Sequence, residues 1–500
     1  MKKIYFLLGL LLCGISASAY DFEAGGIYYN ITGTDSVTVT KGTNNYFGTV
    51  NIPEKVTNGE KEYVVGAIEA DAFSGTNINT VVIPGSVNAI PDKAFSSCKQ
   101  LKLAYLDKGV TSIGESAFSN CETMNSLTLP NTVTTIGNNA FQSCKSLPSV
   151  TIPGSVKHIS DCAFLMCTGL QYVTITDGVE SIGSSAFFGC NRLTSIALPN
   201  SVKTLSNGAF MSCIYLKTVT LGSALATIGD DCFTNCHSIQ SIDVADENPN
   251  FTSIEGVLFN NDTTTIMLYP PARPGETYAF PASVTKIGKQ AFRNNTKLVN
   301  VDIPDGITEI GDYAFSGAGR LANVTMTNSV GYIGTSAFYG CLVLKSIRLS
   351  EAIMALNYSV FKDCYALDSI TIPASVKRVE SSAFASCNKL TAITCLPTTP
   401  PMTNSYAFQG INPTIYVQKG CKEAYLNASI WQNFKIVEIG AEDILGDVNG
   451  DELVNVSDVT ALVNHILGTA EYPTERCDVN KDGEVNVSDV TALINIILAQ

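Results

Sequence analysis

Two acidic twelve-residue segments near the end of the chain carry the residue types most suited to chemistry. They read DVNGDELVNVSD at residues 447–458 and DVNKDGEVNVSD at residues 478–489. Calcium-binding loops place oxygen ligands at positions one, three, five, seven, nine and twelve, with a backbone carbonyl at position seven. The ligands expected on this pattern are Asp447, Asn449, Asp451, the carbonyl of Leu453, Asn455 and Asp458, followed by Asp478, Asn480, Asp482, the carbonyl of Glu484, Asn486 and Asp489. Hard oxygen ligands without thiolate or imidazole favour calcium over zinc, so two calcium ions are expected.

An amphipathic helix is expected after each segment. The apolar residues with helical spacing are Val459, Leu462, Val463, Ile466 and Leu467, and then Val490, Leu493, Ile494, Ile497 and Leu498. The stretch before the first loop, EIGAEDILG, is too short to supply an entering helix and is interrupted by glycine. A merely solvated acidic tail would not explain why the ligand period and the helix period occur together.

Two loop-plus-helix halves resemble a type I dockerin domain. One departure is Glu452, which occupies the loop position where glycine usually makes the sharp turn. The resemblance implies that residues 447–500 fold with calcium and dock onto a cohesin-like partner. By the same resemblance, the docking residues are Val456, Ser457, Val463 and Asn464, and in the second half Val487, Ser488, Ile494 and Asn495.

The middle of the chain is a repeat array with a period of 23 residues. The phase is marked by phenylalanine at 73, 95, 118, 141, 164, 187, 210 and 233, and again at 292, 315, 338, 361, 384 and 408. A repeat this short cannot bury a core alone, so the coils must stack and cover one another. The pattern, seen in SVTIPGSVKHISDCAFLMCTGL, resembles the BspA-type leucine-rich repeats of bacterial surface proteins.

The fold class expected is therefore mainly β, a leucine-rich-repeat solenoid with β-rich caps, joined to a small all-α dockerin of two loop-helix repeats. The expected domains are a signal peptide at 1–19, an N-terminal cap at 20–71, repeats at 72–411, a closing cap at 412–440, a linker at 441–446 and the dockerin at 447–500. The phase break between Phe233 and Phe292 predicts a hairpin-like insertion at about 246–280, either a structural element or a contact site.

The first residues indicate export. Two lysines precede an apolar run that ends at small residues, which is typical of a secretory signal peptide cleaved after Ala19. We therefore expect a secreted or surface-associated bacterial protein without a transmembrane segment. The formal net charge of −14 argues against a nucleic-acid partner, which would require a basic face.

Ten cysteines lie three residues after a repeat phenylalanine, as Cys167 does after Phe164. Asn295 and Ala318 fill the same position in other repeats, which favours a ladder of small buried thiols over obligatory disulfide pairs. Partial disulfides between adjacent coils remain the alternative. No two cysteines have CxxC spacing, which argues against zinc.

No catalytic motif stands out, and we expect no enzyme. The three histidines, His158, His237 and His465, lie outside the known catalytic patterns. The strand residues expected to face outward are Val82, Tyr105, Thr128, Thr151, Thr174, Ala197, Thr220, Asp243, Asp302, Thr325, Arg348 and Thr371. They form either a solvated stripe or a flat face for a protein or glycan, with Tyr105 and Tyr172 as aromatic contacts.

The sequence thus predicts an exported adhesion or binding protein that is tethered through its dockerin to a larger assembly. Two alternatives remain open. One is an accessory component of extracellular polysaccharide breakdown, because dockerins usually accompany glycan-degrading enzymes. The other is a glycoside hydrolase, which needs a carboxylate pair that the sequence does not show.

Overall fold

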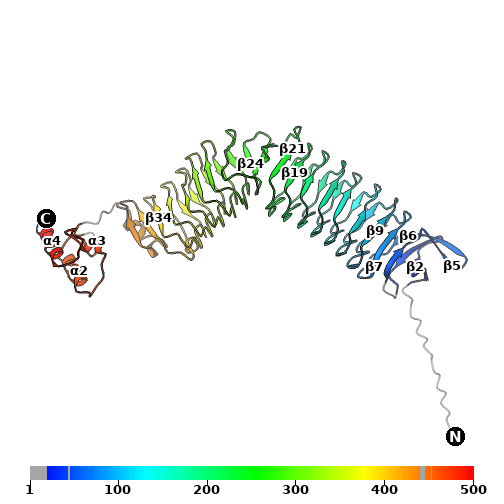
Figure 1. Ribbon diagram of the computed structural model, residues 1–500, viewed down its shortest axis with the longest axis horizontal. Coiled ribbons are helices and arrows are strands. Elements are labelled where there is room, and N and C mark those ends of the chain that lie inside the picture. The colour runs from blue at the N-terminus through cyan, green and yellow to red at the C-terminus, as the bar shows by residue number, and fades with distance from the viewer. Residues whose placement is uncertain (1–19, 43–45, 440–444, 452, 500) are drawn as a thin grey trace, which may run out of the picture.

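The computed structural model describes residues 20–42, 46–439, 445–451 and 453–499. These residues form a curved β-solenoid and a small helical module at the C-terminal end (Figure 1). The mainly β solenoid and the few C-terminal helices expected from the sequence are both confirmed. The expected signal peptide at 1–19, most of the expected linker and Glu452 lie outside the described residues.

The N-terminal end is covered by a five-stranded sheet in the order β1-β2-β3-β6-β5. Its strands are β1 (Phe22–Ala24), β2 (Ile27–Ile31), β3 (Ser36–Thr40), β5 (Lys55–Asn58) and β6 (Lys61–Ile68). Neighbours pair antiparallel except β3 and β6, which are parallel. Strand β4 (Phe47–Asn51) leaves this sheet and pairs with the first solenoid strand, β7 (Asn77–Ile83).

One face of the solenoid is built from the longer strand of each coil. After β7 these strands are β9 (Leu103–Leu106), β11 (Ser126–Thr128), β13 (Ser149–Ile152), β15 (Tyr172–Ile175), β17 (Ser195–Ala197), β19 (Thr218–Leu221), β21 (Ser241–Val244), β26 (Asn300–Ile303), β28 (Asn323–Met326), β30 (Ser346–Ile347), β32 (Ser369–Ile372) and β34 (Ala392–Cys395). Val150 and Ile152 of β13 are buried, whereas Ser149 and Thr151 are exposed, as the period of two requires.

A second face is built from two-residue strands. They are β8 (Ala89–Ile90), β10 (Ser112–Ile113), β12 (Thr135–Ile136), β14 (His158–Ile159), β16 (Ser181–Ile182), β18 (Thr204–Leu205), β20 (Thr227–Ile228), β25 (Lys286–Ile287), β27 (Glu309–Ile310), β29 (Tyr332–Ile333), β31 (Ala355–Leu356) and β33 (Arg378–Val379). Pairing is parallel with an offset of 23 residues, for example Ser181 with Thr204. Each repeat position therefore forms a ladder along the axis.

The repeat phenylalanines form the centre of the core. From Phe73 to Phe233, successive rings are stacked with centroids 4.9–5.8 Å apart. A second run extends from Phe292 to Phe408 with centroids 4.8–5.8 Å apart. The 23-residue period thus encodes a continuous column of aromatic rings within each run.

The repeat cysteines form a second buried ladder beside the rings. All fifteen cysteines of the described chain are free thiols. The sulfur of Cys213 donates to the carbonyl oxygen of Phe187, 3.2 Å away, and most other ladder cysteines repeat this bond to the preceding coil. Burial raises the pKa of the Cys190 thiol well above its ordinary value. The ladder therefore consists of protonated thiols that pair with carbonyl groups.

The phase break contains three antiparallel strands. These are β22 (Phe251–Ile254), β23 (Val257–Asn260) and β24 (Thr265–Leu268), of which β24 returns to the array by pairing in parallel with β25. The hydrophobic core divides here, because Leu258 belongs to the cluster before the break and Val257 to the cluster after it. The insertion is therefore a seam between two stacks of coils.

The last coils end in a cap of mixed structure. It contains η1 (Ser405–Phe408), β35 (Thr414–Val417), α1 (Lys422–Leu426), η2 (Trp431–Asn433) and β36 (Ile436–Glu438). Trp431 is buried, packs edge-on against Phe408, and donates from its indole nitrogen to the carbonyl of Pro401 at 2.8 Å. The aromatic column is closed by this ring.

The C-terminal module contains α2 (Val456–Ile466), α3 (Thr474–Cys477) and α4 (Val487–Leu498). Its fully buried apolar residues are few: Val448, Ala461, Leu462, Cys477, Val479 and Leu493. So small a core gives little stabilisation by itself, and the two loops that precede α2 and α4 must contribute.

Candidate metal centre and docking face

Each acidic loop leads directly into a helix through the same cap. The side chain of Asn455 accepts a hydrogen bond from the N–H of Ser457, and Asp458 accepts from the N–H of Asn455 at 2.8 Å. Asn486 and Asp489 form the identical capping box on α4. Capping satisfies N–H groups at the helix start that would otherwise lack partners. The last acidic residue of each loop therefore also lies in the first turn of the helix and takes part in its cap.

The first loop brings three carboxylates together. Ligand oxygens of Asp447, Asp451 and Asp458 all lie within 4.8 Å of one another, and among the described residues no other group of three such side chains meets this criterion. Asp458 is fully buried and Asp447 nearly so. Backbone N–H groups of Gly450 and Asp451 donate to Asp447 at 2.8 and 3.1 Å. Three carboxylates at this spacing repel one another unless a cation lies between them.

The second loop repeats most of these contacts. Asp489 accepts from the N–H groups of Asn480 and Asn486 at 3.1 and 3.0 Å, as Asp458 does from Asn449 and Asn455. One oxygen of Asp478 accepts from the N–H of Gly483 at 3.0 Å. Hydrogen bonds from the backbone N–H of Glu484 and the Asn480 side chain lower the pKa of Asp482. The three carboxylates of this loop are thus held by hydrogen bonds, although within the described residues only those of the first loop come within 4.8 Å of one another.

The donor set fits calcium. Two oxygens bound to one calcium ion at 2.3–2.6 Å can be at most about 5 Å apart, and the first loop meets this limit. Asn449 and Asn480 add amide groups, which here donate to Asp451 and Asp482 at 2.9 and 2.8 Å. Bound calcium would be held by these side chains and would neutralise the buried carboxylates. Which of the twelve expected ligands bind the ion stays a prediction.

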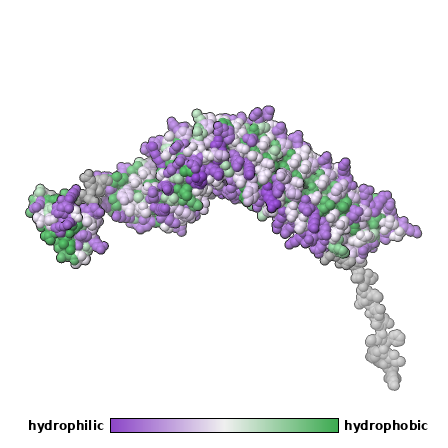
Figure 2. Space-filling view, in the orientation of Figure 1, coloured by the Kyte–Doolittle hydropathy of each residue, from purple (hydrophilic) through white to green (hydrophobic). Residues whose placement is uncertain are grey.

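The predicted docking residues lie on the surface of the helical module. Val456 and Val487 are 71% and 70% exposed, Val463 and Ile494 are exposed as well, and so are Ser457 and Ser488. Asn495 is exposed, and Asn464 is half-buried. Hydrophobic residues gather on the visible face of the module in Figure 2. Docking through these residues stays a prediction.

The apolar face expected on each helix is only partly buried. Leu462 and Leu493 lie in the core, but Leu467 and Leu498 are 68% and 79% exposed. Helical periodicity predicts which residues share a face, but it does not predict how much of that face a neighbouring element covers. The exposed leucines extend the docking residues by one helical turn; the sequence placed them on the apolar face of each helix but not among the docking residues.

The solenoid side chains singled out in the sequence also point outward. Tyr105 is 48% and Tyr172 64% exposed on the long-strand face. The solenoid surface seen in Figure 2 mixes hydrophilic and hydrophobic residues along its length. Asn323 donates to Asn300 at 2.8 Å and Ser346 donates to Asn323 at 3.0 Å, so polar ladders run along the axis.

One histidine has a contact that the sequence did not suggest. His158 Nδ1 lies 2.7 Å from the hydroxyl oxygen of Ser181 on the short-strand face. The two residues are cross-strand neighbours in β14 and β16, so ordinary register explains the contact. His158 is exposed and Ser181 half-buried, and neither lines the cavity at residues 228–294 or the one at residues 23–51.

Fold and loops together define a repeat solenoid that carries a calcium-loop docking module. The chain belongs to the BspA type leucine rich repeat family, whose six-copy model matches residues 44–147, 66–191, 134–266, 275–391 and 309–432. Residues 445–498 match the dockerin type I domain, a domain that binds calcium and cohesin partners. Both families are typically non-catalytic. No curated protein matches the chain.

Solved structures support the same assignment. A leucine-rich repeat protein from Bacteroides ovatus is 26% identical, with a TM-score of 0.59 over 84% of this chain and 100% of that one. A leucine rich cell surface protein from Faecalibacterium prausnitzii is 26% identical, with a TM-score of 0.50 over 81% of this chain and 96% of that one. The pneumococcal vaccine antigen PcpA, at 23% identity, shares the fold with a TM-score of 0.53 over 83% of this chain and 96% of that one.

These relatives include a bacterial surface protein, and the likeness suggests that this chain is secreted or held at the cell surface. Within the residues that the structure describes, none of the helices has the length and apolarity needed to cross a bilayer.

Proposed function

We propose that this is an exported, non-catalytic adhesion protein whose solenoid engages an extracellular ligand and whose dockerin, loaded with two calcium ions, docks it onto a cohesin-like partner. The observation that carries the proposal is the duplication in the helical module. Asn455–Asp458 and Asn486–Asp489 are equivalent capping pairs, each placed at the end of an acidic loop. The two halves therefore present equivalent surfaces.

The exposed apolar residues of the two helices support docking. Val456, Val463 and Leu467 on the first half correspond to Val487, Ile494 and Leu498 on the second, always 31 residues later. Exposed apolar side chains on so small a module cost solubility unless a partner covers them. Because the loops fix the start of each helix, loss of calcium would disorder this surface and release the partner.

The test measures calcium-dependent capture. The full chain is immobilised, and cohesin modules in solution or the secreted proteins of the producing bacterium are passed over it with calcium or with chelator. We expect binding that chelator abolishes and that the double variant Val463→Asp, Ile494→Asp weakens at least tenfold. Val343→Asp, an exposed solenoid position, is the matched control. Binding that ignores calcium would contradict the proposal.

The solenoid ligand is proposed to be an extracellular protein or glycan. The same chain, applied to arrays of matrix proteins and of polysaccharides, separates the two ligand classes. Selective binding to polysaccharide would favour a role in extracellular polysaccharide breakdown. Turnover of a glycan that a single carboxylate substitution abolishes would instead show a hydrolase.

A further inference from the structure

Neighbouring coils of the solenoid are joined by backbone hydrogen bonds on either side of each repeat phenylalanine. In an intact coil, the N–H groups of Ser185, Phe187 and Gly189 donate to carbonyl groups of the next coil. The acceptors are Asn207, Ala209 and Met211, at 3.0, 2.8 and 2.9 Å. This three-bond ladder recurs along both stacks and satisfies N–H groups that face the next coil.

The ladder is broken at the seam. Asp231, Phe233 and Asn235 hold the same three positions in the last coil before the insertion, yet their N–H groups donate to no acceptor in the described part of the chain. Phe233 is nevertheless buried. The last coil of the first stack therefore presents three unpaired donors at alternate residues, the arrangement found at the edge of a β-sheet.

The opposite wall of the seam presents acceptors. The next repeat phenylalanine is Phe292, and the carbonyl groups that should accept in its coil belong to Lys289, Ala291 and Arg293. Only Ala291 is used, by the N–H of Tyr269 at 2.7 Å. For the other two carbonyls, no hydrogen bond is present within the described residues. The unpaired N–H groups of the first stack and the unpaired carbonyl groups of the second stack thus lie on opposite walls of the seam and form no hydrogen bond with each other.

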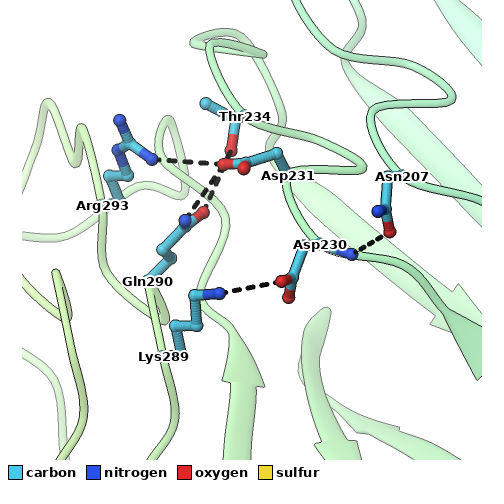
Figure 3. A network of polar contacts seen from close by, with 7 residues as sticks. All are labelled: Asn207, Asp230, Asp231, Thr234, Lys289, Gln290 and Arg293. Carbon is cyan, nitrogen blue, oxygen red and sulfur yellow. Dashed lines mark hydrogen bonds and ion pairs between the residues drawn. The ribbon is translucent and has the colours of Figure 1, made fainter. Parts of the chain in front are cut away.

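Side chains bridge the seam instead of backbone groups (Figure 3). Lys289 Nζ lies 2.9 Å from Asp230, and Gln290 donates to Asp231 at 3.0 Å. Arg293 reaches the same Asp231 oxygen at 3.3 Å. These side-chain contacts occur where the backbone ladder between neighbouring coils is absent. Each of these charges has an opposite partner, so the seam does not attract a simple ion.

A cavity of about 300 Å³ lies between the two walls. Its apolar side is formed by Phe233, Met267, Leu268 and Tyr269. The aromatic column is interrupted here. Phe233 stacks on Phe210 at 5.8 Å and Tyr269 on Phe292 at 4.7 Å, but no ring pair joins Phe233 to Tyr269 in the described chain. The space has the size of a small ligand pocket and the lining that an aromatic ring prefers.

We infer that the seam binds an extended peptide segment that carries an aromatic side chain. The peptide main chain accepts from the N–H groups of Asp231, Phe233 and Asn235, as in strand addition at a sheet edge, and its ring enters the cavity. The intact coils supply the template, because segments such as GESAFSN at 114–120 make these same contacts elsewhere in the array. Entry of the peptide replaces the half-buried Gln290 bridge.

This inference rests on the proposed role of the solenoid as a ligand-binding rod and names the class of ligand. The probe is the fluorescein-labelled peptide GESAFSN, titrated with the full-length chain in calcium and followed by fluorescence anisotropy. We expect saturable binding with a dissociation constant of about 1 mM or tighter. The peptide GESAASN, which lacks the ring, is expected to bind at least tenfold more weakly.

Two protein variants localise the site. Met267→Trp fills the cavity and is expected to weaken binding at least tenfold, whereas Met166→Trp, an exposed methionine on an intact coil, should leave binding unchanged. Hydrogen exchange of the wild-type chain gives a second readout that does not depend on the folding of a variant. Segment 229–237 should exchange faster than its equivalent 183–191 in the free protein, and the peptide should slow it.

Equal binding of both peptides, no binding at several millimolar, or no protection of segment 229–237 would overturn the inference. The titration is repeated after chelation, where peptide binding should persist because the seam holds none of the calcium ligands. Loss of calcium-dependent docking with retained peptide binding would therefore count against the dockerin proposal alone. Loss of peptide binding with retained docking would count against the seam alone.

Discussion

Asp458 and Asn455 hold each other in a reciprocal cap: the carboxylate of Asp458 accepts from the N–H of Asn455 at 2.8 Å, while the Asn455 side chain caps the first turn of α2. The same carboxylate lies within 4.8 Å of Asp447 and Asp451 in the proposed metal cage. Helix capping and the proposed ion binding therefore use one side chain, and the second half repeats the capping arrangement at Asp489.

Removal of calcium should unfold the helical module and spare the solenoid. The module buries too few apolar residues to fold without its ions. The solenoid core consists of stacked rings and parallel strands that bind no metal in this account. Far-ultraviolet circular dichroism of the full chain should lose most of its helical signal with chelator, and calcium should restore it. The β signal should not change.

Replacement of a stacked ring should destabilise the solenoid strongly. Phe187 is fully buried between Phe164 and Phe210, each 5.3 Å away. Phe187→Ala leaves a cavity in the column and should cost about 3–5 kcal/mol of unfolding free energy. Its sequence neighbour Phe188 is half-buried and outside the column. Denaturant unfolding should show a much smaller loss for Phe188→Ala, and equal losses would argue against the column as the main support.

The ladder thiols should be unreactive in the folded chain. Burial raises the pKa of Cys190 well above its ordinary value, and the thiolate is the reactive form. Cys162 is half-buried instead, although burial also raises its pKa. A thiol reagent at pH 8 should label Cys162 before any ladder cysteine, and all thiols after denaturation. Mass spectrometry of the labelled peptides checks the order, and disulfides between adjacent coils would contradict it.

The column of phenylalanine rings and the acidic loops could be predicted from the sequence because the residues that form each of them recur at a fixed spacing. Phenylalanine every 23 residues specifies stacked rings whatever the exact path of the chain. The seam could not be predicted in this way. Asp231 and Gln290 are 59 residues apart and become neighbours only because three strands of the insertion return the chain to the array. The exposure of Leu467 could likewise not be predicted, because helical periodicity does not show which neighbouring element covers a helix face.

Stability of the seam should depend on the charge of Asp231. Burial raises the pKa of this carboxyl, but hydrogen bonds from Thr234 and Gln290 and the positive charges of Arg293 and Lys289 outweigh burial and lower it. When the pKa of a carboxyl is lower in the folded state than in the unfolded state, its charge stabilises the fold at pH values above the unfolded-state pKa. This contribution is lost as the pH falls through the folded-state pKa.

Asp231→Asn should therefore lower the melting temperature at pH 7, and its difference from wild type should shrink at pH 3 and below. Asp305→Asn, an exposed aspartate on another coil, is the control and should change little at either pH. The melting temperatures of the wild type and of both variants, measured between pH 7 and pH 3, test this prediction. A difference that grows on acidification would show that the bridging network does not favour the carboxylate.

Oxygen cages at both acidic loops are predicted to hold cations and thereby to shape the docking module. Titration calorimetry of the full chain with calcium measures this uptake directly. We predict about two ions bound per chain, with one site lost in Asp458→Asn, the other in Asp489→Asn, and both in the double variant. Absence of calcium uptake by the wild-type chain at millimolar concentration, or uptake that the double variant retains, would contradict the account.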